Sequence, residues 1–262
     1  MEGPVITKRA AKACLLASFL FLAGCSAFFG FNLLKGLDKA PAPDPSQYNY
    51  ATNGEAGLLK LSTDLGSQAI VNAMIGDPQA TSTIESNLQT TYNDPSVPVA
   101  DRELAAALYS DVNLKTTSGS VVVTNAVNLV QSGTNGQSVQ QILQEIVPDN
   151  VKSDPTAFTN MVDGLLNSCA AYQVLGGSLT PPAQAPPGVN MGDVAQKAAT
   201  AWTMQCVVTA VEGGTLTQQQ AIDQMYAITN GQSSTVTVPD PFSPAPGWLS
   251  NIFTVAGATM PS

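Results

Sequence analysis

The feature that most constrains the fold is a series of helical patterns, each opened by a capping residue and closed by proline or glycine. Ser138 and Thr217 are each followed three residues later by glutamine, which is the spacing of a helical capping box. Asp154-Pro155 places an N-cap residue directly before proline at the first helical position. Gly213-Gly214 is typical of a helix C-terminus. This punctuation predicts short connections between helices.

Apolar residues recur at helical spacing along most of the chain. The expected helices cover residues 55–75, a segment from 82, a segment from 101, and residues 120–131, 138–147, 154–176, 190–213 and 217–230. Residues 235–238 have β character, but a strand of that length cannot build a sheet. We therefore predict an all-α fold of antiparallel helical hairpins. An irregular, tetratricopeptide-like α-solenoid and a closed helical bundle both remain compatible with the pattern.

The N-terminus carries a targeting pattern. Lys8, Arg9 and Lys12 precede an apolar run that ends in Leu22-Ala23-Gly24-Cys25. This segment resembles the signal peptide of bacterial lipoproteins, whose lipobox it matches at all four positions. The resemblance implies cleavage before Cys25 and lipidation of its thiol through a thioether, with fatty acyl chains such as palmitate on the attached lipid. An uncleaved transmembrane helix is the alternative, because no charged residue occurs until Lys35 and about 20 residues span a bilayer.

Four regions follow from this interpretation. They are a lipoprotein signal peptide (1–24), a lipidated apolar arm with a Pro-rich spacer (25–50), an all-helical domain (51–231) and a Pro-rich C-terminal tail (232–262). The resemblance implies a cell-envelope location with the membrane as a partner through the lipid on Cys25. Ser26 stands where aspartate tends to retain such lipoproteins in the inner membrane, so we expect the outer membrane, facing the periplasm.

The charge of the chain argues against nucleic acid as a partner. The whole chain has a net charge of −9. Removing residues 1–24 takes three of the 10 basic residues and one of the 19 acidic ones, which leaves 7 and 18 and a net charge of −11. The remaining basic residues are scattered, whereas phosphate binding needs clustered Lys and Arg.

The absence of histidine excludes many catalytic and metal sites. Without imidazole there is no Ser-His-Asp or Cys-His machinery and no His-ligated zinc or iron. Asp111 to Lys115 begins like a calcium loop, but lysine stands at the fifth place and threonine, not glycine, at the sixth. We therefore expect no cofactor, no metal and no enzymatic activity.

Two cysteines remain after Cys14 leaves with the signal and Cys25 is lipidated. In an oxidising compartment Cys169 and Cys206 are most simply read as a disulfide. The helices that carry them are neighbours in sequence, so the bridge is geometrically permitted but not required. Two buried thiols are the alternative.

The apolar C-terminal segment has two interpretations. Trp248, Leu249, Ile252 and Phe253 follow a proline-rich stretch near the end of the chain. They can fold back onto the helical body as a final lid. They can also serve as candidate partner-docking residues, because aromatic side chains are frequent interface anchors.

These observations favour a membrane-anchored, non-catalytic helical scaffold or adaptor for another envelope protein. The alternative is a solute-binding lipoprotein that captures a small molecule for an envelope transporter, which an enclosed, aromatic-lined pocket would support. An enzyme that uses a pair of carboxylates is a third class, but the linear spacing of acidic residues predicts no such pair.

Overall fold

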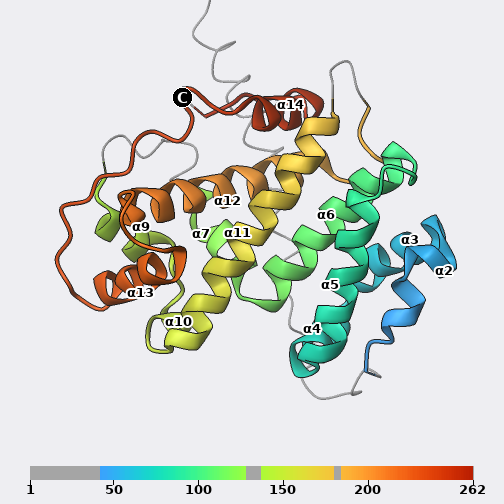
Figure 1. The fold of residues 1–262 in the computed structure, drawn as a ribbon, viewed down its shortest axis with the longest axis horizontal. Helices are drawn as coiled ribbons and strands as arrows, with labels where there is room; N and C mark the ends of the chain where they lie inside the picture. The colour runs from blue at the N-terminus through green and yellow to red at the C-terminus, as the bar shows by residue number, and fades with distance from the viewer. Residues whose placement is uncertain (1–41, 128–136, 180–183, 262) are drawn as a thin grey trace, which may run out of the picture. The chain divides into compact units, whose positions relative to one another are not determined.

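The structure, a computed structural model, describes residues 42–127, 137–179 and 184–261 (Figure 1). In these residues the regular structure consists of twelve α-helices and one 3-10 helix, so the predicted all-α fold is confirmed. The elements are η1 (Pro45–Tyr48), α2 (Tyr50–Asn53), α3 (Glu55–Asp64), α4 (Gln68–Gly76), α5 (Pro78–Asn93), α6 (Val99–Thr116), α7 (Gly119–Asn125), α9 (Val139–Ile146), α10 (Asp149–Lys152), α11 (Pro155–Ser178), α12 (Met191–Glu212), α13 (Gln218–Thr229) and α14 (Gly247–Val255).

The long helix α11 organises the packing. It contacts α6, α12, α13 and α14, and its most extensive contact is with α6, which lies well before it in sequence. Figure 1 shows α11 running through the middle of the helical body. Apolar residues of α11 are buried on several of its faces, as expected for a helix surrounded by others. Because the units of a solenoid contact only their neighbours in sequence, these contacts favour a bundle around α11.

The predicted helix starts are reproduced where the side chain itself caps the backbone. Ser138 and Thr217 both form complete capping boxes with the glutamine three residues on. The Asp154 carboxylate accepts hydrogen bonds from the first-turn amides of α11, and the Asn190 side chain does the same for α12. These four caps satisfy amides that a helix would otherwise leave without partners.

Three predicted helices differ from the structure. The helix expected over 120–131 ends at Asn125, the last residue of α7, before the described residues stop at 127. The expected helix over 55–75 is divided into α3 and α4, because the chain turns at Gly66. The helix expected from Ser82, where Ser82 and Glu85 have the spacing of a capping box, begins four residues earlier, at Pro78. Its N-cap is Asp77, whose carboxylate accepts a hydrogen bond from the Ala80 amide. A proline at the first helical position and an aspartate cap define a stronger start than the Ser82 pattern.

The C-terminal segment folds back onto the body. Helix α14 packs against α11 and α12. Leu249 and Ile252 are completely buried, and Phe253 is nearly so. The alternative role of Trp248, Leu249, Ile252 and Phe253 in docking an external partner stays a prediction. Their apolar surface already lies against the protein's own helices, where burial is favourable.

Aromatic contacts fix this segment in place. The indole Nε1 of Trp202 on α12 donates a hydrogen bond to the carbonyl oxygen of Pro241, at 2.6 Å. The rings of Trp202 and Trp248 meet edge to face, with centroids 6.0 Å apart. Such aromatic pairs contribute beyond their buried area, so residues 241–253 form part of the folded body.

Gly176 allows α14 to approach α11, and this makes the docking testable. A Cβ atom at Gly176 would overlap the backbone carbonyl oxygen of Trp248. We expect Gly176→Ala to lower the free energy of unfolding by about 2 kcal/mol, the usual cost of overpacking. Protease cleavage of the C-terminal segment should also become faster. Urea denaturation and limited proteolysis measure the two effects.

The neighbouring glycine provides a matched control. A Cβ at Gly177 would meet no atom within 4 Å. Gly177→Ala should therefore raise the free energy of unfolding by about 0.5 kcal/mol through helix propensity. Equal destabilisation by the two substitutions would contradict the tight contact between α11 and α14.

No helix in residues 42–127, 137–179 and 184–261 is both long and apolar enough to cross a bilayer.

Candidate functional site

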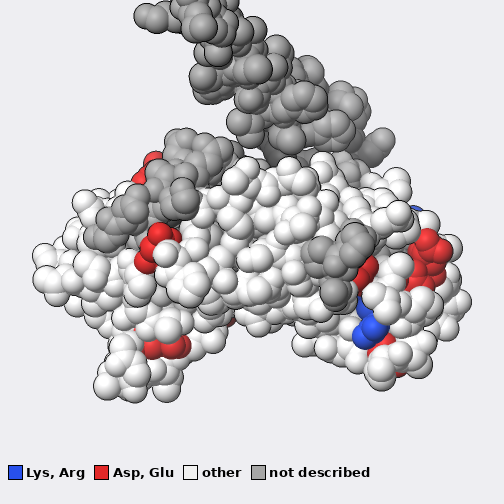
Figure 2. Space-filling model, turned by 90° about the horizontal axis from the view of Figure 1, so that it is seen from above, with Lys and Arg blue, Asp and Glu red and all other residues white. Residues whose placement is uncertain are grey.

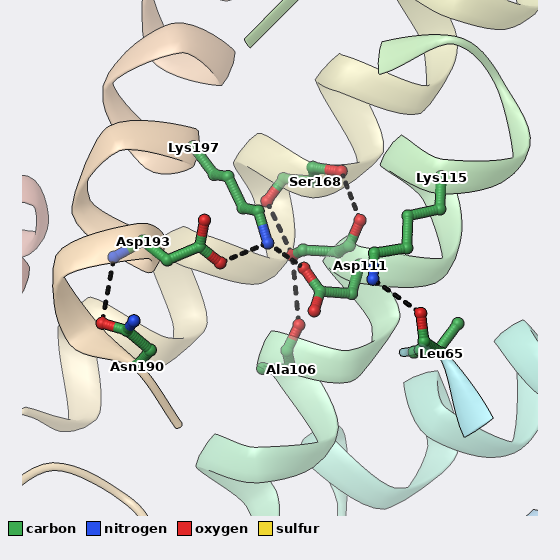
Figure 3. Close-up of polar contacts among 9 residues, drawn as sticks. Leu65, Ala106, Asp111, Lys115, Ser168, Asn190, Asp193 and Lys197 are labelled. Carbon is green, nitrogen blue, oxygen red and sulfur yellow. Dashed lines mark hydrogen bonds and ion pairs between the residues drawn. The ribbon is translucent and has the colours of Figure 1, made fainter. Parts of the chain in front are cut away.

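A buried ion-pair network joins α6 and α12, and it is the candidate functional site. Only 7% of the Lys197 side chain is exposed. Its Nζ lies 2.7 Å from Oδ1 of Asp111 and 2.5 Å from Oδ2 of Asp193. Figure 3 shows the ammonium group placed between the two carboxylates. Paired, hydrogen-bonded charges of this kind are the form in which proteins tolerate buried lysine.

Local helix geometry positions two members of the network. Asp193 and Lys197 are one turn apart on α12, which is the spacing of an intrahelical ion pair. Asp193 lies in the first turn, where its negative charge is favourable near the helix N-terminus. The Asn190 cap holds this turn by accepting hydrogen bonds from the amides of Gly192 and Asp193.

Tertiary packing supplies the third member. Asp111 lies on α6, 86 residues before Lys197. Both α6 and α12 pack against α11, which brings the two side chains together. One turn further along α6, the Nζ of Lys115 donates a hydrogen bond to the carbonyl oxygen of Leu65, at 2.8 Å. Leu65 stands at the end of α3, so the network also holds the turn between α3 and α4.

The electrostatic environment keeps Lys197 charged. Burial acts to lower the pKa of Lys197, but the negative charges and hydrogen bonds of Asp111 and Asp193 outweigh it, so the pKa is raised. A lysine acts as a general base only when it is neutral. At neutral pH this ammonium therefore holds the two helices together and offers no free pair of electrons to a nearby hydroxyl.

The nearby serines are bound to backbone carbonyls. Ser168 Oγ on α11 lies 2.7 Å from the carbonyl oxygen of Gly164 and 3.3 Å from that of Ser110. Ser110 Oγ lies 3.1 Å from the carbonyl oxygen of Ala106. These hydroxyls stabilise the α6 and α11 contact and are not arranged as activated nucleophiles, which need a base within hydrogen-bond reach.

A small pocket opens beside the two carboxylates. Its volume is about 140 Å³. It is lined by Ser62 of α3, Leu104, Ala107, Leu108 and Asp111 of α6, Gly188 to Asn190, and Asp193 and Val194 of α12. Asp111 and Asp193 thus face Lys197 on one side and the pocket on the other. Their side chains are 28% and 34% exposed.

A larger hollow lies elsewhere in the described part of the chain. It has a volume of about 490 Å³ and is open to solvent. Its lining is mostly polar and comes from α7, α9, α10 and adjoining residues: Thr124, Asn125, Gln144, Glu145, Val147, Pro148, Asp149 and Lys152. Neither hollow has an aromatic wall. The described residues also contain no group of three or more acidic or cysteine side chains able to hold a metal ion.

The Tyr172 hydroxyl is a buried polar group with incomplete hydrogen bonding. Tyr172 is completely buried on α11, and its Oη forms no hydrogen bond of normal geometry in the described structure, although the Ser110 side chain interacts with it. Burial, followed by the negative charges of Asp111 and Asp193, raises the pKa of Tyr172 well above its usual value. An unsatisfied buried hydroxyl costs free energy.

We expect Tyr172→Phe to raise the free energy of unfolding by about 1 kcal/mol, because it removes this hydroxyl and keeps the ring. The thermal midpoint should rise by about 2 to 4 °C for a domain of this size. Tyr48→Phe is the matched control. Tyr48 is also buried, but its hydroxyl donates to Asp64 at 2.8 Å. Tyr48→Phe should lower the thermal midpoint. Equal effects of the two substitutions would contradict the incomplete hydrogen bonding of the Tyr172 hydroxyl.

The structure places the predicted site residues apart from this network. Cys25 lies outside the described residues, so its lipidation stays a prediction. Cys169 and Cys206 are free thiols, the first buried and the second partly exposed. They lie on adjacent packed helices, but the predicted disulfide is not formed in this structure. The C-terminal aromatic and aliphatic residues form part of the core, as described above.

Sequence reasoning missed the ion-pair network. A local signal existed for half of it, since Asp193 and Lys197 are spaced for a helical pair just after the Asn190 cap. Nothing in the sequence marks Asp111 as their partner, because that contact depends on how α6 and α12 pack on α11.

Comparisons with protein-family models, with curated proteins and with solved structures find no match to this chain. Function is therefore inferred from the residues and geometry of the chain itself.

Proposed function

We propose that this protein is a membrane-anchored lipoprotein of the bacterial envelope that acts as a non-catalytic helical adaptor for another envelope protein. The anchor rests on one observation, the four-position match of residues 22–25 to a lipobox behind a basic segment and an apolar run. The proline-rich segment before η1 would then act as a spacer between membrane and helical body.

The filled interior supports a role at the surface. Apolar side chains of nearly every helix form one continuous buried cluster. The pocket beside Asp111 is smaller than the usual 300 to 1,000 Å³ of small-molecule sites, and the larger hollow is open and polar. Solute capture, the alternative function, has less support because it needs an enclosed site of that size.

The surface charge supports a protein partner. Figure 2 shows a face on which most atoms belong to uncharged residues, with separate acidic spots and few basic ones outside the parts drawn in grey. Lys60 and Lys152 are paired with Asp64 and Asp149, so their charges are partly neutralised. Such a surface suits neutral polar contacts better than binding of a phosphate backbone.

The anchor is tested by intact-mass spectrometry of the full chain expressed in a bacterial host. The expected product begins at Cys25 and carries the added mass of acyl chains. Cys25→Ser should yield the unprocessed chain beginning at Met1. An unmodified wild-type chain that still begins at Met1 would contradict the lipoprotein assignment.

The adaptor role is tested by site-specific photo-cross-linking in the native cells. Exposed apolar positions on different helices, Val99, Val121 and Val174, provide the probe sites. We expect a discrete adduct with one envelope protein at some of these positions and none at others. A small molecule that copurifies in a 1:1 ratio, without any protein adduct, would instead favour solute capture.

A further inference from the structure

We infer that a second copy of this chain pairs with the extended segment at residues 233–238, edge to edge and antiparallel. This segment lies between α13 and α14 and contains the short stretch of β character that the helical fold does not use. The pairing is a property of the helical body and does not depend on the adaptor role. The proposed membrane anchor affects only the local concentration of the two copies.

One edge of the segment is bonded to the protein itself. Ser138 and Thr237 form an isolated antiparallel bridge. On either side of it, the Val139 amide donates to the carbonyl oxygen of Val236 at 3.0 Å, and the Val238 amide donates to a carbonyl oxygen just before α9 at 3.3 Å. Figure 1 shows the connection between α13 and α14 passing α9 at the margin of the helical body. These bonds hold the segment extended.

The other edge of the segment has free backbone groups. In an antiparallel ladder, the backbone groups of successive residues point to opposite edges. Val236 and Val238 bond toward α9, so the amides and carbonyls of Thr235 and Thr237 point away from it. Neither threonine has a backbone hydrogen bond among the residues that the structure describes, and both are exposed. An exposed edge of this kind is a template for pairing with another chain.

The sequence of the segment favours its own copy as the occupant. Residues 232–238 contain no charged residue and no proline, which are the residues that usually protect an exposed edge. Threonine and valine alternate from 235 to 238, and both have high β propensity. Antiparallel pairing of two copies places uncharged residues opposite one another, and cross-strand threonine pairs are favourable. Uncharged, β-branched segments on an exposed edge are those that associate with themselves.

The pairing ends at a dimer. A two-fold axis between the segments uses the free edge of both copies at once, which gives an isologous interface. The inner edge of each copy is already bonded beside its own α9, so a third copy finds no free edge there. Because the paired segment is short, we expect weak association in solution. Tethering of all copies to one membrane raises their effective concentration.

The test is sedimentation velocity of the purified full chain in detergent over a range of protein concentrations, where we expect a monomer–dimer equilibrium. Thr237→Pro removes an outward amide and should weaken dimerisation by about tenfold or more, because the change acts twice in a symmetric dimer. The folded monomer tolerates it, since that amide has no partner in the described part of the chain. Thr237→Val keeps the backbone and the branched side chain, and should leave the dissociation constant unchanged.

A second variant leaves every backbone group in place. Thr235→Lys brings two ammonium groups together at the paired edge and should also weaken dimerisation. Added salt should relieve part of this loss through screening. Thr254→Lys adds the same charge at an exposed position of α14 and is the matched control, for which no change is expected. Thermal unfolding of each variant at low concentration confirms that the monomer is folded.

Photo-cross-linking in the native cells identifies the occupant of the edge. A cross-linker at Ser233, an exposed residue of the segment, should give an adduct of twice the mass of the chain. The same cross-linker at the exposed Ile75 of α4 should give no such adduct.

Self-pairing is contradicted by any of three results. The first is a chain that stays monomeric in detergent and gives no adduct with itself in cells. The second is a Thr237→Pro variant that dimerises as well as the wild type, which would place the contact elsewhere. The third is an adduct at Ser233 with a different protein only, which would assign the edge to a strand of that partner.

Discussion

Replacement of Lys197 by methionine is expected to lower the free energy of unfolding by about 3 kcal/mol. Removing one partner of a buried ion pair leaves the other charges uncompensated, and this usually costs about 3 to 5 kcal/mol. The lower end applies because Asp111 and Asp193 are partly exposed and remain hydrated. Methionine keeps the length of the side chain, so the loss reflects charge and not a cavity. Urea denaturation at pH 7 measures the effect.

Two further variants separate this explanation from a general loss of packing. Lys152→Met removes an exposed ion pair with Asp149 and should change stability little, as surface pairs usually do. Adding Asp111→Asn and Asp193→Asn to Lys197→Met removes the two unpaired carboxylates and should restore most of the lost stability. A triple variant as unstable as the single one would show that the lysine stem, and not its charge, holds the helices together.

The sequence predicts the fold best where the deciding interaction is local. Ser138, Asp154, Asn190 and Thr217 each cap the helix that follows them, and a cap depends only on the next three residues. The same reasoning was wrong at Ser82, because Asp77-Pro78 lies just before it and starts the helix earlier. A local rule fails when two local signals compete and their relative strength is not considered.

The position of the C-terminal segment and the ion-pair network could not be predicted in this way. The sequence left two interpretations of residues 248–253, because its apolar pattern is the same whether it covers the protein's own helices or a partner. Gly176, which permits the contact, lies far from it in sequence, as Asp111 does from Lys197. Both contacts follow from packing against α11, and packing of distant helices is not encoded in local periodicity.

The second large effect is expected at alkaline pH. The free energy of unfolding should fall steeply as the pH rises above about 9. Burial is the largest cause of three raised pKa values. It raises the pKa of the Cys169 thiol to about 12, that of the Cys206 thiol to about 11 and that of the Tyr109 hydroxyl to about 12. Burial also raises the pKa of Tyr172. In the unfolded chain these groups lose their protons near pH 9 for cysteine and pH 10 for tyrosine.

The direction follows from proton binding. Between the unfolded and folded pKa values, the folded state keeps protons that the unfolded chain has released, so stability decreases with rising pH. Lys197 acts in the same direction, because the stabilisation from its raised pKa is lost once it deprotonates. Lys115 opposes it, since its pKa is lowered by burial. Because several buried groups act in this direction, we expect the loss between pH 9 and 11 to be a large part of the small net stability of a typical domain.

Acidic pH should have the opposite effect. Burial raises the pKa of Glu85, Glu103 and Asp163, so the folded state takes up protons at a higher pH than the unfolded chain does. Stability contributed by these carboxyls is gained as the pH falls through their folded pKa values. The chain has no histidine, so no side chain with an ordinary pKa near 6.5 titrates between pH 6 and 8.

Thermal unfolding of the reduced protein from pH 4 to 11 tests the whole profile. The midpoint should be nearly constant from pH 6 to 8, should not fall between pH 6 and 5, and should drop sharply above pH 9. The double variant Cys169→Ala, Cys206→Ala should flatten the decline between pH 9 and 10, where thiols titrate, and leave the decline above pH 10, where tyrosines do. A midpoint that stays level to pH 11 would mean that these thiols and hydroxyls are not buried in the folded protein.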